Sequence, residues 1–238
     1  MKTISFVSFK GGAGKTTSLR LLASVLNGRE RRVGLFDADE NRPLAAWETY
    51  ATGLGTWDAE KFRVYEALDE GQMETAIEAA TGDGMEYALV DTHGGGSDLN
   101  QLILLNSDLI VIPTDLCVGE LDEALKTMEY VLRLLKLAGI DIPTGFLPNR
   151  TPVDDGKLAT AEREGIELLG GLPVFDVRLP VQRCYKDIKG SGPLNLYHAR
   201  LKADPTIRFR SVSILVALGH AEAFTDEILR SVRTPELA

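Results

Sequence analysis

Short apolar runs alternate with longer amphipathic segments along the whole chain. The apolar runs are rich in β-branched residues, as buried parallel strands usually are, and they predict strands at 3–8, 32–37, 62–66, 87–91, 108–112, 142–148 and 172–177. The longer segments repeat their apolar residues at helical spacing, and they predict helices at 15–27, 43–51, 70–81, 97–106, 118–138, 155–170, 180–190 and 206–232. The segment 51–60, which contains two glycines, is predicted to be a surface loop.

This alternation of strand and helix predicts an α/β fold, in which helices cover both faces of a doubly wound, mostly parallel sheet. A chain of 238 residues has the size of one such domain, so we interpret residues 1–238 as a single domain. Sheets of this kind bind their ligands at the carboxyl ends of the strands. The residues that follow each predicted strand are therefore the candidates for chemistry.

A glycine-rich segment lies between the first predicted strand and the first predicted helix. It consists of Lys10, Gly11, Gly12, Ala13, Gly14, Lys15, Thr16 and Thr17. Its glycines allow backbone N–H groups to approach phosphate oxygens, and the following helix directs its positive end at them. Lys15 is the candidate for the β- and γ-phosphates of ATP, and the Thr16 hydroxyl is the candidate ligand of Mg²⁺. Lys10 is not needed to bind a nucleotide, so we interpret it as a charge delivered to another active site.

Carboxylates follow two further predicted strands at the same edge of the sheet. Asp37 and Asp39 come after the second strand, and we expect Asp39 to orient the attacking water while Asp37 lies nearer the metal. Asp91 ends a strand in the manner of a Walker B motif, and its carboxylate is expected to hold Mg²⁺ through water. The glycines after it, Gly94 among them, permit a loop whose N–H groups sense the γ-phosphate. For His93 we favour a role in this loop over one in catalysis.

An amide side chain, Asn149, follows the predicted strand 142–148 and precedes Arg150. Asparagine offers both donors and an acceptor, which match the edge of adenine. Taken alone, however, an asparagine at this place is better interpreted as an ordinary turn residue.

The charge of the chain is unevenly distributed. The formal net charge is −9, which by itself argues against binding to nucleic acid. Residues 178–210 nevertheless carry eight basic and only two acidic residues, a local net charge of +6 that leaves −15 for the remainder. Clustered cations bind DNA phosphates through counterion release, and few aromatic residues lie between them, which favours duplex over single-stranded DNA. The candidates are Arg178, Arg183, Lys186, Lys189, Arg208 and Arg210; the alternative is a solvated basic surface that pairs with the acidic remainder.

Composition also indicates the setting of the protein. Cys117 and Cys184 stand in no metal-binding spacing, which is typical of a reducing, cytoplasmic environment. We see no signal peptide and no apolar stretch near the ~20 residues that span a bilayer. The last predicted helix carries Glu222, Asp226 and Glu227, whereas interfacial helices prefer basic polar faces. We therefore interpret it as a packing helix and do not expect binding to a membrane.

Taken together, these motifs resemble those of one family. The segment 10–17 resembles the deviant Walker A box of the ParA/MinD superfamily, and Asp37-Ala38-Asp39 and Asp91 resemble its second box and its Walker B end. Asn149-Arg150 resembles its adenine-contacting motif, and Leu179-Pro180 stands where a second nucleotide-flanking segment is expected. The resemblance runs from residue 2 to about residue 200. The stretches 36–44 and 87–95 are most similar to the ParA-type ATPases of the virC operon of T-DNA-transferring bacteria.

The resemblance implies a mechanism as well as a fold. It implies a homodimer that assembles around ATP, in which Lys10 of each subunit reaches the phosphates of the other. Such a dimer would bind DNA nonspecifically or at an enhancer element, and slow hydrolysis, stimulated by DNA or by an unidentified partner or adaptor, would release it. The implied roles are DNA partition and T-DNA or conjugative transfer, in a cytoplasmic protein associated with DNA or the nucleoid. A MinD-like ATPase that positions proteins at a membrane or on the nucleoid is the alternative.

Overall fold

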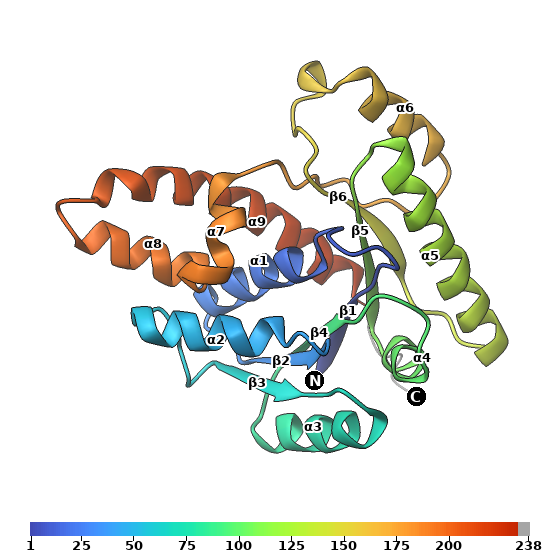
Figure 1. The fold of residues 1–238 in the computed structure, drawn as a ribbon, viewed down its shortest axis with the longest axis horizontal. Helices are drawn as coiled ribbons and strands as arrows, with labels where there is room; N and C mark the ends of the chain where they lie inside the picture. The colour runs from blue at the N-terminus through green and yellow to red at the C-terminus, as the bar shows by residue number, and fades with distance from the viewer. Residues whose placement is uncertain (233–238) are drawn as a thin grey trace.

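The computed structural model describes residues 1–232, which fold around one parallel sheet (Figure 1). Within these residues the sheet has six strands, in the order β3-β2-β4-β1-β5-β6. They are β1 (Lys2–Phe6), β2 (Val33–Ala38), β3 (Phe62–Glu66), β4 (Tyr87–Thr92), β5 (Leu109–Thr114) and β6 (Thr144–Pro148). The predicted doubly wound α/β fold is confirmed.

Helices cover both faces of the sheet (Figure 1). One face carries α1 (Lys15–Gly28), α2 (Pro43–Leu54), α7 (Arg183–Ser191), α8 (Leu194–Ala203) and α9 (Ser211–Ser231). The other face carries α3 (Glu70–Gly82), α4 (Asp98–Leu105), α5 (Val118–Ala138) and α6 (Thr160–Leu168). Successive strand residues point to opposite faces, so Phe6 joins the core under α1 and α9, and Val7, just past the end of β1, joins the core under α5.

The strand order brings the chemical motifs together. β1 lies between β4 and β5, and its register pairs Phe6 with Asp91; β2 pairs Asp37 with the same residue. Because all of these strands are parallel, the segments that follow β1, β2 and β4 meet at one edge of the sheet. The glycine-rich segment 10–17, called the P-loop from here on, and both acidic motifs are thus neighbours, although 75 positions separate Thr16 from Asp91.

The predicted seventh strand, 172–177, is wrong. The segment runs beside β6 but makes only an isolated bridge between Phe146 and Val174. The ladder does not continue because the N–H of Val177, on the side that faces β6, donates to the carboxylate of Glu227 on α9 at 2.8 Å, and because Pro148 of β6 has no N–H to donate. The N–H of Asp176 donates to the same carboxylate at 2.6 Å. A side chain distant in sequence thus takes a donor that a seventh strand would have used.

The helix predictions also needed correction. The predicted helix 155–170 is a short 3₁₀ turn, Asp155–Lys157, followed by α6, and the predicted helix 206–232 is a 3₁₀ turn, Arg208–Arg210, followed by α9. α8 was missed because its apolar stripe is weak: of its ten residues only Leu194 and Leu201 are buried. α2 extends to Leu54, into the predicted loop 51–60.

No helix within residues 1–232 combines the length and the apolar character needed to cross a membrane.

Candidate functional site

The P-loop connects β1 to α1 as predicted, and its geometry leaves backbone donors for a ligand. Gly12 and Gly14 have φ angles of +82° and +105°, which glycine adopts without strain. Gly14 caps α1 with no side-chain hydrogen bond to the helix. The first N–H groups of α1 therefore keep their donors for phosphate oxygens, and the helix dipole adds to this attraction.

The structure brings together two oxygen ligands suited to a metal ion. The Thr16 hydroxyl donates to Asp91 Oδ2 at 2.5 Å. Asp91 is 1% exposed, and burial raises the pKa of its carboxyl group to about 6, against the opposing effect of the Thr16 hydrogen bond and of Lys15. A hydroxyl and a carboxylate are hard oxygen donors of the kind that Mg²⁺ prefers, so Thr16 and Asp91 fit the predicted site.

Asp37 has two different oxygen environments. Its Oδ2 accepts hydrogen bonds from the backbone N–H groups of Leu44 and Ala45, both at 2.9 Å, and so caps the first turn of α2. Its Oδ1 is buried and has no hydrogen-bond partner among the described residues. Burial raises the pKa of this carboxyl group. One oxygen of Asp37 thus orders α2, and the other is left able to accept a further hydrogen bond.

Sequence reasoning missed Arg20, whose positive charge opposes the negative charges of Asp37 and Asp91. The residue is buried on α1, stacks over the Trp47 ring at 5.5 Å and donates to Pro43 O. Burial lowers the pKa of its guanidinium group to about 10, while Asp91 and Asp37 oppose that shift. The signal in the sequence was a single charge inside the apolar run Leu19–Leu22.

Asp39 lies close to the loop that follows β4. Its Oδ1 accepts from the backbone N–H and from the side-chain amide of Asn41, each at 2.9 Å, and lies 3.7 Å from His93 Nδ1. Gly94 lies close to the P-loop: a Cβ atom added to it would be 3.4 Å from Phe9 O. The segment that follows β2 and the loop that follows β4, which we predicted to sense the γ-phosphate, therefore meet at the P-loop.

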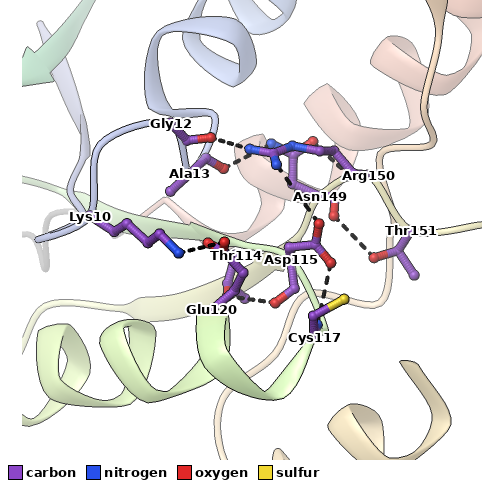
Figure 2. A network of polar contacts seen from close by, with 10 residues as sticks. All are labelled: Lys10, Gly12, Ala13, Thr114, Asp115, Cys117, Glu120, Asn149, Arg150 and Thr151. Carbon is purple, nitrogen blue, oxygen red and sulfur yellow. Dashed lines mark hydrogen bonds and ion pairs between the residues drawn. The ribbon is translucent and has the colours of Figure 1, made fainter. Parts of the chain in front are cut away.

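Asn149 and Arg150 clamp the P-loop from the opposite side (Figure 2). Asn149 Nδ2 donates to Ala13 O at 3.1 Å, and the Arg150 guanidinium donates to Gly12 O. The approach is close: a Cβ atom on Gly14 would lie 1.8 Å from Asn149 Nδ2. Only glycine fits at this position of the loop.

A cavity of about 190 Å³ lies beside this clamp and has the place expected of a nucleotide base. Its lining comprises Gly12, Gly14, Thr17, Asn149, Arg150, Pro180, Val181, Gln182, Tyr185 and Lys186. Leu179 does not contribute its side chain, which is buried in the core; only its backbone pairs with Asn149. Sequence reasoning missed Val181, Gln182 and Tyr185, which follow Pro180 in a segment without a motif of its own.

Lys10 points to its own chain (Figure 2). Its Nζ donates to Glu120 in the first turn of α5. The P-loop lysine predicted to act on a second subunit is thus held by an ion pair within the single chain.

The structure divides the predicted DNA-binding residues among three places. Arg183, Lys186 and Lys189 lie exposed on α7, and Lys186 also lines the cavity beside the P-loop. Arg208 and Arg210 are exposed in the turn between α8 and α9, at the end of these helices farthest from the sheet in Figure 1. Arg178 has a side chain only 21% exposed and pairs with Asp155 at 2.5 Å. The six residues do not form one continuous cluster.

Strand order, P-loop and acidic motifs define the class of the protein, a P-loop NTPase fold of the ParA/MinD type. The structure of pNOB8 ParA has a TM-score of 0.67 to this one at 15% identity, over 97% of this chain and 98% of that chain. The McdA(D38A)–ATP complex from Cyanothece has a TM-score of 0.64 at 17% identity, over 100% of this chain and 99% of that chain.

Sequence comparison defines the family more closely. A family model described as VirC1 protein matches residues 1–234. The protein virC1 of Rhizobium rhizogenes is 42% identical over 218 residues, which make up 92% of this chain and 93% of that relative. The chain belongs to the VirC1 family, and the resemblance inferred from its motifs is confirmed.

Proposed function

We propose that this protein is an ATPase that binds Mg²⁺–ATP at the P-loop and hydrolyses it. The observation that carries this proposal is the meeting of Thr16 and Asp91 at one end of the P-loop with the Asn149–Arg150 clamp and its cavity at the other. In this proposal the phosphates lie along the P-loop, between the metal ligands and the base cavity. The McdA relative in fold is an ATP complex, which supports this choice of ligand.

Each residue near the P-loop has a role in this proposal. Backbone N–H groups of residues 11–17 hold the phosphate oxygens, and Lys15 reaches the β- and γ-phosphates. Burial lowers the pKa of Lys15, while Asp91 and Asp39 favour its charged form. Thr16 and Asp91 would hold Mg²⁺, which supplies positive charge against the phosphate oxygens. Asp39 orients the attacking water, and Asn149 binds the adenine edge.

Dimerisation completes the proposed site. Lys10 leaves Glu120 and reaches the phosphates of a second copy, where it acts as an arginine finger does. Hydrolysis is slow, because phosphoryl transfer depends on positioned charges and the single chain holds Lys10 on Glu120. DNA or a partner protein accelerates it.

The cellular role that we propose is ATP-dependent binding of duplex DNA during T-DNA or conjugative transfer, or during DNA partition. Membership of the VirC1 family supports the transfer role, and the ParA-type fold supports the partition role. The exposed cations of α7 and of the α8–α9 turn are the proposed contacts with DNA phosphates.

One observation favours a second candidate, positioning at a membrane. Phe209, Val212, Leu215 and Val216 are between 54 and 73% exposed, and Arg208 and Arg210 flank the first of them. An apolar surface with basic neighbours is the composition of an interfacial contact with anionic lipids. This exposed apolar surface is confined to the start of α9. Ile214, Leu218 and Phe224 of the same helix are buried, as the predicted packing role requires.

The test is a DNA-retention assay with ATP, ADP or no nucleotide at two salt concentrations, together with the mass from light scattering. The proposal expects a dimer with ATP alone and DNA binding that weakens with salt. A dimer that does not bind DNA but sediments with anionic liposomes would contradict the DNA-binding role and favour positioning at a membrane. A monomer that binds no ATP would overturn the proposed activity.

A further inference from the structure

The loop 93–96, which joins β4 to α4, has free backbone donors beside the P-loop. Within residues 1–232, no hydrogen bond uses the backbone N–H groups of Gly94 or Gly96. A Cβ atom added to Gly94 would lie 3.6 Å from Ser8 O, and Lys15 Nζ donates to the same oxygen at 3.4 Å. The loop therefore lies next to the lysine that we assign to the β- and γ-phosphates.

A single buried side chain holds this loop from α4. Asn100 is 1% exposed, and its Nδ2 donates to His93 O at 2.9 Å and to Gly95 O at 2.6 Å. An amide nitrogen carries two hydrogens, so each carbonyl oxygen receives one of them. Asn100 Oδ1 is also buried and has no partner among the described residues. Burial of that acceptor costs free energy and offsets part of what the two hydrogen bonds contribute to stability.

Asn100 thereby sets the direction of the donors in the loop. The described chain has no cis peptide bond, and in a trans peptide unit the C=O and the following N–H point in opposite directions. Because His93 O and Gly95 O are directed at Asn100, the N–H groups of Gly94 and Gly96 are directed away from α4. Backbone N–H groups that are turned outward in this way bind anionic oxygens.

The two ends of the loop are held by other elements. Thr92 Oγ1 donates to Phe6 O on β1 at 2.8 Å. A Cβ atom added to Gly96 would lie 3.2 Å from the Tyr130 ring, so the end of the loop packs closely against α5. Between these ends Gly95 has a φ angle of +121°, which side chains rarely permit. With both ends held, the orientation of the middle of the loop depends on Asn100.

We propose that Asn100 is a positioning residue that presents the N–H groups of Gly94 and Gly96 to the γ-phosphate of ATP. The inference rests on the proposed function, in which ATP lies along the P-loop. Asn100 itself touches neither nucleotide nor metal ion and acts through the two carbonyl groups that it holds. ADP has no γ-phosphate, so the amide of Asn100 contributes to the affinity for ATP and not to the affinity for ADP.

The experiment compares the affinities of the full chain for ADP and for the non-hydrolysable ATP analogue AMPPNP, both with Mg²⁺, by calorimetry. The protein concentration is one at which light scattering gives the monomer. Asn100→Leu removes both donors, and Asn100→Asp replaces them by oxygen. Each variant should weaken AMPPNP binding about tenfold, as expected for the loss of charge-assisted hydrogen bonds, and change ADP binding less than about twofold.

A second variant, Gly95→Ala, changes the loop without entering the buried position. No atom lies within 4 Å of the added methyl group, but the positive φ angle is unfavourable for alanine, so the loop should change its conformation while the fold is kept. It should show the same selective loss of AMPPNP binding, and it keeps the proposal testable if a change at Asn100 prevents folding. Unchanged AMPPNP binding in Gly95→Ala, or equal losses of AMPPNP and ADP in the Asn100 variants, would overturn the proposal.

The matched control is Asn106→Leu at the other end of α4. Asn106 is exposed, and its Nδ2 donates to Leu102 O within the same helix. This variant should bind both nucleotides as the unaltered protein does. An unaltered protein that binds neither nucleotide would contradict the proposed function. The positioning role is then decided by ¹⁵N relaxation of residues 94–96 without nucleotide: these amides should be more mobile in Asn100→Leu than in Asn106→Leu, and equal mobility would contradict it.

Discussion

The edge of the sheet where β1, β2 and β4 end and the basic segment 178–210 are both rich in charge, but their charges are arranged in different ways. At this edge of the sheet, charges sit at the ends of adjacent parallel strands, where the register holds Asp37 and Asp91 side by side. In the basic segment the cations lie on α7, on α8, on the α8–α9 turn and in a connecting segment. The comparison teaches that strand register brings functional groups together even when they are far apart in the sequence. Closeness in the sequence alone does not do so.

Removing the P-loop lysine should have the largest effect. Lys15→Ala is expected to abolish ATP binding, a loss of at least about a hundredfold, because in the proposed site Lys15 is the cation that the same chain supplies to the β- and γ-phosphates. Equilibrium titration with a fluorescent ATP analogue measures it, and Lys157→Ala, on an exposed turn, is the control. Unchanged affinity would remove Lys15 from the site.

Asp39→Ala should separate binding from turnover. The variant is expected to bind ATP and to form the dimer. Its rate of hydrolysis should fall roughly a hundredfold, because the attacking water is no longer oriented. Phosphate release and light scattering measure the two properties. A normal rate of hydrolysis would assign the water to another residue near the P-loop.

Asp91 should make the metal-free protein less stable as the pH rises. Its folded pKa of about 6 exceeds the ordinary value of 3.8 for this carboxyl group, so the folded state binds the proton more tightly. The free energy of unfolding should therefore fall between about pH 4 and pH 6, and the lowest stability is reached above the folded pKa. Two pKa units correspond to about 3 kcal/mol. Asp91→Asn should unfold at a higher temperature at pH 7 and lose this slope in thermal melts without Mg²⁺ or nucleotide; an unchanged slope would contradict the argument.

The basic segment should give smaller and divided effects. Arg183→Glu with Lys189→Glu on α7 should weaken DNA retention about tenfold and spare ATP binding, because both residues are exposed and neither lines the base cavity. Lys186→Glu should affect both, since it lines that cavity. If all three behave alike in both assays, the cations of α7 form a single functional surface.

The smallest effect is expected at Arg178. Arg178→Gln removes its ion pair with the exposed Asp155 and should cost less than about 1 kcal/mol of stability. DNA retention should not change, because the guanidinium group is already engaged with Asp155 and Pro152 O. Loss of DNA binding at this position would restore the continuous basic surface that the structure divides.

Much of the fold could be predicted because its strands are short, apolar and buried on both faces. The prediction failed at 172–177, where the carboxylate of Glu227 takes two backbone donors, and at α8, where two buried leucines seven positions apart give a weak pattern. In both places the deciding partner lies elsewhere in the chain. The motif residues of the candidate site were identifiable, whereas Arg20 and Gln182 belong to no motif, and only their burial and neighbours place them at the site.

The sequence by itself determined the α/β class, the P-loop and the acidic strand ends, because local spacing and strand periodicity are properties of the chain alone. Only the tertiary structure decided that Thr16 hydrogen bonds to Asp91, that Asn149 presses on Gly14 and that Lys10 is held by Glu120. These features depend on strand order and on the angles between helices. Those are set by packing between residues far apart in the sequence, which no local pattern records.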